Sequence, residues 1–507
     1  MHNQTEQALL NLLLAEGLPS MLRSAARRLF LRIQEGHTAV LLEADEQVAW
    51  EQSPWATGSA AMSPLWVTNG WLQTGRHRAQ EARVALELKR RATPIATDSL
   101  DPLSLMPQAD ASQQAAILGA MGRQLSLILG GPGSGKTTTA AAIIAAKYHQ
   151  LSHIERPAIA LLAPTGKAAV RLTESFQNAL ARMPEPLKPV LDAKATTIHR
   201  QLDQLGDCDL ILVDEASMVS LDLMDRMLSR LRPEAHLILM GDPHQLASVE
   251  AGSVLSTLAQ SAAFTTDRFI LTGRHRTEAG QALNHIQDLC LAGNFEGFKD
   301  ALQALQIPWM QPQNEASLEA CIHEGYAPYF AAIEAGQTRI IPAFQCLTSI
   351  SSGVGGRHWV NRLVSQQAAA RGLDGLGNRI LITENQPTLD LYNGDIGVYQ
   401  ERQTDPTPEI WISGSERTVQ RHQINQPETA YAISIHRSQG SEYADVLVCL
   451  PEPPERSRYQ PSRELLYTAL TRAKQSIALF ASESQLAAAL ATPTHRDSCL
   501  EHFLAED

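Results

Sequence analysis

Residues 130–137 read Gly130-Gly131-Pro132-Gly133-Ser134-Gly135-Lys136-Thr137 and match G-x-x-x-x-G-K-[ST], the pattern of a phosphate-binding loop. The apolar run Leu125–Leu129 comes directly before this loop, and an Ala-rich helical stretch that begins at Thr138 follows it. In such a unit the backbone N–H groups surround the phosphates, the lysine reaches the β- and γ-phosphate oxygens, and the threonine hydroxyl binds Mg²⁺. We therefore expect residues 130–138 to bind ATP and Mg²⁺, with Lys136 acting in catalysis.

A second apolar run, Leu210–Val213, ends in the two carboxylates Asp214 and Glu215. Asp214 is placed to hold Mg²⁺, and Glu215 to orient and deprotonate the attacking water. Because adjacent residues of a strand point to opposite faces, both can serve one site only where the strand ends and the backbone turns. The pair indicates ATP hydrolysis rather than nucleotide binding alone.

Short apolar runs alternate with helical stretches from about residue 106 onward, at 125–129, 158–163, 210–213 and 237–240. Continuous runs of this kind are typical of strands that are buried on both faces of a parallel sheet. The pattern predicts an α/β fold, a helical segment near 278–335 and a second α/β region from about 340. Within that region, residues 376–428 are rich in Gly, Pro, Asn and Thr, which predicts a small β insertion.

Composition limits the classes of protein to which the chain can belong. The net charge of −12 over 507 residues argues against a protein that coats nucleic acid without specificity, but a local DNA-binding groove stays possible. The six cysteines form no C-x-x-C pair, which argues against a structural zinc site and favours a reducing compartment. With no apolar run of about 18 residues and no basic stretch before the N-terminal apolar part, we expect a cytoplasmic protein without a membrane span.

Two further polar residues lie at positions from which they could contact the γ-phosphate of a bound ATP. Gln245 follows the run 237–240 and could sense the γ-phosphate and couple it to movement. Arg472 lies on a predicted helix near 464–474, from which an arginine of a second domain would stabilise transition-state charge. A phosphate-binding loop alone does not separate kinases, GTPases, transporter ATPases and helicases.

Five further segments make the sequence resemble the superfamily 1 helicases and, within them, the RecD family, the alpha chains of RecBCD-type helicase–nucleases. In chain order they are Ala163–Ala169, Thr196–Arg200, Val213–Met218, Leu391–Gly397 and Ile435–Glu442. The resemblance covers roughly residues 106–507 and implies two tandem RecA-like motor domains, at 106–276 and 277–507. It also implies that the β insertion is SH3-like, and that a small N-terminal domain at 1–105 docks onto partner subunits.

The resemblance also implies roles for single residues. Gln113 would contact the adenine, and Arg276 would meet the γ-phosphate alongside Arg472. The residues that would contact single-stranded DNA are Pro164, Thr165, Lys167, Thr197 and His199 on the first motor domain, and Asn393, His436, Ser438 and Gln439 on the second. Hydroxyls, amides and a few cations can hold a phosphate backbone without reading its sequence, which suits a protein that moves along a strand.

These features predict an ATP-dependent 5′-to-3′ DNA helicase that acts with RecB-like and RecC-like partners at DNA duplex ends, in double-strand break repair and recombination. Outside the ATP site we find no Asp/Glu/Lys cluster suited to phosphodiester cleavage, so we expect the nuclease activity in a partner chain. Two alternatives stay open: a free-standing helicase of the same class, and a scaffolding subunit with an inactive motor. The first 105 residues lack a helix–hairpin–helix signature, which argues against the former; the intact Lys136, Asp214 and Arg472 argue against the latter.

Overall fold

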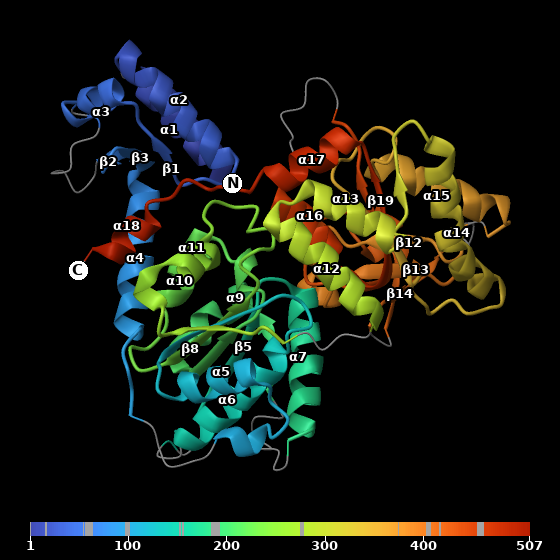
Figure 1. Cartoon of the computed structure of the whole chain (residues 1–507), viewed down its shortest axis with the longest axis horizontal. Helices are drawn as coiled ribbons and strands as arrows, with labels where there is room; N and C mark the ends of the chain where they lie inside the picture. The colour runs from blue at the N-terminus through green and yellow to red at the C-terminus, as the bar shows by residue number, and fades with distance from the viewer. Residues whose placement is uncertain are drawn as a thin grey trace.

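The computed structural model describes residues 2–506 with gaps in several loops. The residues outside the description are 16–17, 54, 56–63, 97–101, 152–153, 155–156, 184–192, 274–277, 374, 402–406, 415–416 and 454–460. Residues 96–102, whose Asp- and Pro-containing sequence predicts a linker, lie almost wholly among them. Figure 1 shows three parts: N-terminal helices in blue, a first α/β unit in cyan to green, and a second in yellow to red.

The first α/β unit is built on a six-stranded, all-parallel sheet with strand order β6-β5-β7-β8-β4-β9. Its strands are β4 (Leu125–Leu129), β5 (Ile159–Ala163), β6 (Thr196–Thr197), β7 (Leu210–Val213), β8 (His236–Gly241) and β9 (Arg268–Ile270). The four apolar runs that predicted strands each form one, so the α/β prediction is confirmed. β4, β7 and β8 are buried along their whole length, as strands covered on both faces must be.

Different helices cover the two faces of this sheet. The helices of the unit are α5 (Ala111–Met121), α6 (Lys136–Gln150), α7 (Gly166–Ala181), α9 (Ile198–Gln201), α10 (Leu221–Leu228) and α11 (Val254–Gln260). Apolar side chains of α5, α6 and α7 share one core with Ile128, Leu212 and Ile238. Residues one position along the same strands, such as Leu127 and Val213, pack with α10 and α11 in the other core. This alternation is the two-residue period of a strand.

The second unit holds a five-stranded, all-parallel sheet with strand order β10-β19-β18-β11-β17. Its strands are β10 (Trp309–Met310), β11 (Phe344–Thr348), β17 (Ala432–Ser434), β18 (Tyr443–Leu450) and β19 (Ala473–Ala481). Its helices are α12 (Glu278–Ala292), α13 (Phe295–Ala304), α14 (Glu315–Glu334), α15 (Arg357–Ala370), α16 (Arg463–Leu470) and α17 (Glu483–Ala491). The helical segment predicted near 278–335 is confirmed as α12, α13 and α14.

The predicted β insertion is a separate antiparallel sheet of five strands in the order β15-β14-β13-β12-β16. The strands are β12 (Arg379–Leu381), β13 (Ile396–Tyr399), β14 (Glu409–Ile412), β15 (Thr418–Gln420) and β16 (Glu428–Thr429). Ile380, Val419 and Ile424 belong to an apolar cluster of its own, which lets it stand beside the parallel sheet. Its SH3-like character stays a prediction.

The N-terminal part has its own small core. It comprises α1 (His2–Ala15), α2 (Ser20–Gln34), β1 (Ala39–Leu41), α3 (Ala44–Glu51), β2 (Leu65–Thr68), β3 (Trp71–Thr74) and α4 (Gly75–Arg91). Three antiparallel strands, in the order β1-β3-β2, pack against α1, α2 and α3. Trp50 is fully buried there, among mainly aliphatic side chains such as Leu13 and Leu29.

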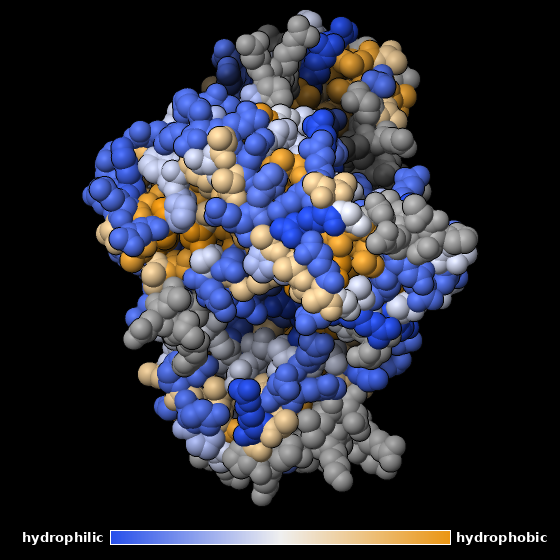
Figure 2. Space-filling model, turned by 90° about the vertical axis from the view of Figure 1, so that its right-hand side faces the viewer, coloured by the Kyte–Doolittle hydropathy of each residue, from blue (hydrophilic) through white to orange (hydrophobic). Residues whose placement is uncertain are grey.

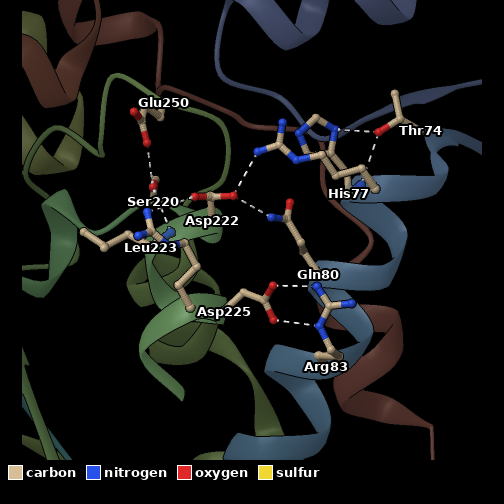
Figure 3. A network of polar contacts seen from close by, with 11 residues as sticks. Thr74, His77, Gln80, Arg83, Ser220, Asp222, Leu223, Asp225 and Glu250 are labelled. Atoms are coloured by element: carbon tan, nitrogen blue, oxygen red, sulfur yellow. Dashed lines mark hydrogen bonds and ion pairs between the residues drawn. The ribbon is translucent and has the colours of Figure 1, made fainter. Parts of the chain in front are cut away.

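Helix α4 leaves this core and covers the first parallel sheet. Val84, Ala85 and Leu88 share an apolar core with strands β4, β7 and β8. Figure 3 shows the polar side of the contact: Arg83 donates two hydrogen bonds to Asp225 of α10, at 2.9 and 2.6 Å. One turn away, Asp222 accepts hydrogen bonds from Arg76 and Gln80. The helix therefore packs as a layer on the first α/β unit, although the sequence analysis placed it in a separate N-terminal domain.

The C-terminus returns to the same place. Helix α18 (Leu500–Ala505) lies against α4, away from the second sheet (Figure 1). Between them the carboxylate of Glu81, fully buried, accepts hydrogen bonds from Thr38, Gln73, Ser498 and the backbone N–H of Cys499. The end of the chain, predicted as part of 277–507, thus packs on the N-terminal part and the first unit. The domain limits themselves stay a prediction.

Figure 2 shows one face that is mainly hydrophilic, with apolar side chains in separate patches between polar ones. Among the described residues, no helix combines the length and the apolar character that crossing a membrane requires.

Candidate ATP site and the cleft between the two sheets

The phosphate-binding loop connects β4 to α6. Gly133 and Gly135 adopt positive φ angles of 76° and 80°, which glycine tolerates and which turn the loop around a central space. Lys136 folds its Nζ into that space and donates hydrogen bonds to the carbonyl oxygens of Gly130 and Gly131, at 2.7 and 3.0 Å. The hydroxyl of Ser134 is buried there and has no hydrogen-bond partner among the described residues. This loop is therefore shaped to accept a polar, anionic group.

The two carboxylates after β7 both reach the same cavity. Glu215 adopts the left-handed conformation, with φ 50° and ψ 40°, which is uncommon for a residue with a side chain. This turn at the strand end satisfies the expected requirement, because Asp214 and Glu215 both line a cavity of about 240 Å³ with Lys136 and Thr137. The local backbone strain lies at the residue predicted to activate water, as strain often does at functional sites.

Burial raises the pKa of Asp214, and the neighbouring Glu215 charge raises it further; Lys136 only partly offsets these effects. The site therefore lacks the positive charge that would favour the ionised form of Asp214 beside a second acidic group. A divalent cation would supply that charge. The hydroxyl of Thr137 and the carboxylate of Asp214 are hard oxygen donors of the kind that Mg²⁺ prefers, so the residues fit this ion.

The far wall of this cavity comes from the second unit, and Gln245 and Arg472 meet there. Arg472, which follows α16, donates a hydrogen bond from Nη2 to Oε1 of Gln245 at 3.0 Å. Its Nε donates to the carbonyl oxygen of Thr468 at 3.0 Å, and its Nη1 to that of Ser441 at 3.1 Å. Both side chains are buried. The structure thus joins two residues that the sequence separates by more than two hundred positions.

Sequence reasoning missed two further links across the cleft. Tyr467 of α16 donates a hydrogen bond to Oδ2 of Asp242 at 3.0 Å, and Asp242 also accepts one from the Gln245 amide at 3.2 Å. The backbone N–H of Leu246 donates to Oγ1 of Thr468 at 2.9 Å. In the sequence, Asp242 stands in a Gly-Asp-Pro string that is typical of a tight turn. Its position directly after a buried strand, like that of Asp214, is the signal that could have identified it.

A second cavity, of about 360 Å³, adjoins the start of the phosphate-binding loop. The residues that line it include Gly130, Gly131, Asp242, Tyr467, Asn284 and Gln287. Asp214 and Glu215 line the first cavity and not this one, so this space lies beside the loop and apart from those two carboxylates. Asn284 and Gln287, on α12, are further residues that the sequence did not single out.

Of two further predicted ATP contacts, one lies outside both cavities and the other lies outside the described residues. Gln113 is buried at the start of α5, where its side-chain oxygen accepts a hydrogen bond from the Asp110 backbone N–H at 3.0 Å. The side chain lines neither cavity, so its contact with adenine stays a prediction. Arg276 lies outside the described residues, and its role also stays a prediction.

Most of the predicted DNA contacts gather at one edge of the cleft. Pro164, Thr165 and Lys167 lie half-buried at the start of α7, and Thr165 caps that helix by accepting a hydrogen bond from the Ala168 N–H. Thr197, half-buried, and His199, exposed, lie at the start of α9, on the adjacent strand end.

Tyr392 brings the exposed Asn393 of the β insertion to this edge. Its ring lies against Gly166 so closely that a Cβ added to Gly166 would be 2.4 Å from Cγ of Tyr392. Its hydroxyl accepts a long hydrogen bond, of 3.4 Å, from Arg200 of α9. The β insertion and the first unit therefore touch where the strand is expected to pass.

The remaining predicted DNA contacts differ in exposure. His436 is exposed. Ser438 is buried and donates to the carbonyl oxygen of Ile435 at 2.6 Å, and buried Gln439 donates to that of Leu246 at 2.7 Å. In this structure both side chains serve contacts inside the protein, so their contact with DNA stays a prediction that the geometry does not favour.

Known proteins show similarity along most of the chain. Residues 108–306 match the model of an AAA domain, and residues 429–480 match that of a UvrD-like helicase C-terminal domain. The chain is 32% identical over 458 residues to the RecBCD enzyme subunit RecD of Mycobacterium tuberculosis, covering 85% of this chain and 79% of that protein. It is 34% identical over 408 residues to the RecBCD enzyme subunit RecD of Mycolicibacterium smegmatis, covering 75% and 72%.

Two more distant similarities complete the comparison. The chain is 29% identical over 418 residues to the ATP-dependent RecD2 DNA helicase of Deinococcus radiodurans, covering 78% of this chain and 52% of that protein. Among solved structures, the Pif1 helicase from Bacteroides in complex with ADP-AlF3 and single-stranded DNA aligns with a TM-score of 0.41 and 16% identity, covering 73% and 92%.

Proposed function

The chain belongs to the RecD family of DNA helicases and is an ATP-dependent DNA helicase; from that premise we propose that it is the 5′-to-3′ motor subunit of a RecBCD-type helicase–nuclease. Its substrates are single-stranded DNA and duplex ends, and its process is the repair of double-strand breaks by recombination. RecB-like and RecC-like chains are its partners, and one of them carries the nuclease activity.

The observation that carries this proposal is the bond between Gln245 and Arg472 across the ATP cleft. Gln245 follows strand β8 of the first unit, and Arg472 follows helix α16 of the second unit. A γ-phosphate bound between the two side chains would therefore be held from both sides of the cleft. Hydrolysis removes that phosphate and the attraction it provides. The cleft then opens. Repeated closing and opening moves the two units relative to each other, and so moves the protein along the DNA strand.

We assign the chemistry within the cleft as follows. Lys136 and the backbone of residues 130–138 hold the phosphates, Glu215 orients and deprotonates the attacking water, and Arg276 and Arg472 stabilise the transferred charge. Mg²⁺, held by Thr137 and Asp214, would neutralise charge on the phosphate oxygens. Gln113 completes the set at the base.

DNA binding completes the motor. Contacts from α7, α9 and the β insertion hold the strand by its backbone, and they release and rebind as the cleft works. We propose motor domains at 106–276 and 277–507 and assign partner docking to the N-terminal core. Exposed apolar side chains on that core, Leu12, Leu31, Leu41 and Val48, support this assignment.

The main alternative is a free-standing helicase. The similarity to the RecD2 DNA helicase favours this alternative. The two proposals differ in whether partner chains are needed. Co-expression of the chain with candidate RecB-like and RecC-like chains, followed by purification through a tag on the partner, distinguishes them. We expect a stoichiometric complex whose ATPase is stimulated by single-stranded DNA, with Lys136→Gln as the inactive control. A chain that never co-purifies but unwinds DNA alone would support the free-standing helicase.

A further inference from the structure

Arg171 lies on the first unit, one helical turn after Lys167 on the same face of α7. Its guanidinium crosses the cleft to a short loop of the second unit. Nη2 pairs with Oε2 of Glu442 at 2.9 Å, and Nη1 donates a hydrogen bond to the carbonyl oxygen of Gly440 at 2.5 Å. Arg171 is not among the residues assigned above to ATP or DNA, yet it holds the second unit with two bonds.

The pair stands between two cavities. One is the cavity of about 240 Å³ that contains Lys136 and the two carboxylates. The other, of about 400 Å³, lies between α7 and the β insertion and is lined by Lys167, Tyr392 and Asp395, among others. Arg171 and Glu442 are the two described residues that line both. The pair is therefore the wall between the nucleotide side and the expected DNA side of the cleft.

The loop that Arg171 holds is also held by Arg472. Between Gly440 and Glu442 lies Ser441, whose carbonyl oxygen accepts a hydrogen bond from Nη1 of Arg472 at 3.1 Å. Arg472 in turn bonds to Gln245. A shift of Arg472 toward a bound γ-phosphate would pull on this loop, and the loop would pull on α7 through Arg171.

We propose that the Arg171–Glu442 pair couples the binding of single-stranded DNA at the start of α7 to closure of the ATP cleft. Arg171 is a positioning residue, because it acts through the loop Gly440–Glu442 and not on the reacting atoms. The pair is partly exposed, with 39% of the Arg171 side chain and 26% of the Glu442 side chain accessible. A pair this exposed contributes little to the stability of the fold, so its importance lies in linking the first unit to the second. This inference rests on the proposed motor function.

Coupling is measured by a thermodynamic cycle, because linkage requires that nucleotide and DNA change each other's affinity by the same factor. The affinity for a fluorescent oligo-dT strand is measured by anisotropy on the full chain, with its partners if they are required, with and without a non-hydrolysable ATP analogue. We expect the analogue to change the affinity of wild type by about tenfold. In Arg171→Ala the change should fall to within about twofold.

Lys474 offers a matched control. Its Nζ pairs with the same carboxylate of Glu442 at 3.3 Å, but it lies at the start of β19, on the same unit as Glu442. Lys474→Ala removes a neighbouring charge without cutting the link across the cleft, so it should keep the wild-type coupling. Arg171→Lys keeps the charge and loses the two-bond geometry, and it should keep an intermediate coupling. Because Arg171→Lys is a conservative substitution, it still tests the coupling if the Arg171→Ala protein does not fold.

The outcomes separate the two proposals. If wild type is stimulated by DNA but Arg171→Ala and Arg171→Lys keep the full wild-type change in DNA affinity on adding the analogue, the pair is only a structural contact and the inference is overturned. If Lys474→Ala loses as much coupling as Arg171→Ala, the effect belongs to the charge of Glu442, and the inference is also overturned. If single-stranded DNA does not change the ATPase rate of the wild-type protein, the proposed function itself is overturned.

Discussion

Arg472 and Gln245 form one buried hydrogen bond, 3.0 Å long, between the two halves of the ATP cleft. Since the Gln245 amide also donates to Asp242, and Arg472 also donates to Ser441, the bond lies at the centre of a continuous polar chain through the cleft. Substitutions of groups that act as such a unit have effects that do not add.

The first prediction is therefore strong non-additivity. Arg472→Ala should lower the DNA-stimulated ATPase rate constant about 10³-fold, because an arginine at the transferred phosphoryl group typically contributes that much. Gln245→Ala should lower it by a smaller factor. The double variant should be no slower than Arg472→Ala, since the glutamine acts in concert with the arginine. Steady-state ATPase of all four proteins measures this; losses that multiply would show that the two side chains act independently.

Glu215 allows catalysis and backbone strain to be separated. Glu215→Gln should bind a fluorescent nucleotide normally and hydrolyse ATP about 10²- to 10⁴-fold more slowly, because only the general base is lost. Glu215→Gly should be equally slow, yet more resistant to unfolding by about 1 kcal/mol, because glycine adopts the left-handed conformation without strain. Nucleotide titration, ATPase and urea unfolding together test this. Lost nucleotide binding in Glu215→Gln would contradict the division of roles between the carboxylates.

Lys147 predicts a pH dependence of stability. It lies fully buried in α6, where Nζ donates to the carbonyl oxygen of Arg123 at 2.7 Å and lies 3.0 Å from Nδ1 of His236. Burial lowers the pKa of Lys147 to about 7, against 10.5 in a free lysine. Between those values the unfolded chain binds one more proton than the folded chain, so the free energy of unfolding rises with pH.

Urea unfolding at pH 7 and pH 9 measures this effect. From pH 7 to pH 9 the wild type should gain about 2 kcal/mol relative to Lys147→Met, which has no titrating group at this position. Lys147→Met should also be the more stable protein at pH 7, where the wild type carries the cost of the buried amine. Parallel pH profiles of the two proteins would show that the lysine titrates normally.

Helix α4 determines where the chain can be shortened. Val84 and Leu88 are fully buried in the core of the first sheet, and each buried side chain of this size contributes about 1.5–3 kcal/mol. A variant lacking residues 1–74 keeps this helix, and it should retain DNA-stimulated ATPase while losing co-purification with the partners. A variant lacking residues 1–105 also loses helix α4, which covers one face of the first sheet. It should therefore unfold at a much lower temperature than the variant lacking residues 1–74. Equal melting temperatures would place α4 outside the motor.

The sequence predicted those parts of the molecule that depend on local pattern. The strands β4, β7 and β8 are mainly apolar, and the loop after β4 has a spacing that phosphate binding dictates. Because the polar residues at parallel strand ends meet at one edge of a sheet, Asp214 and Lys136 could be assigned to one site from their positions in the chain.

Contacts between distant segments could not be predicted in this way. The pairing of Tyr467 with Asp242, and the packing of α18 on α4, depend on how whole elements dock, and nothing local in the chain encodes that. A motif also states which side chains are present, not which way they face. Ser438 and Gln439 belong to a motif typical of DNA contacts, yet both are buried and bonded within the protein.

The direction of movement tests the central claim most directly. Duplexes with a single-stranded tail at either the 5′ or the 3′ end are incubated with ATP and the protein, alone or in its complex with the partner motor inactivated. Strand separation is followed by fluorescence, with Lys136→Gln as the control. The account predicts that the 5′-tailed duplex is unwound and the 3′-tailed duplex is not. Unwinding of the 3′-tailed duplex alone would contradict it.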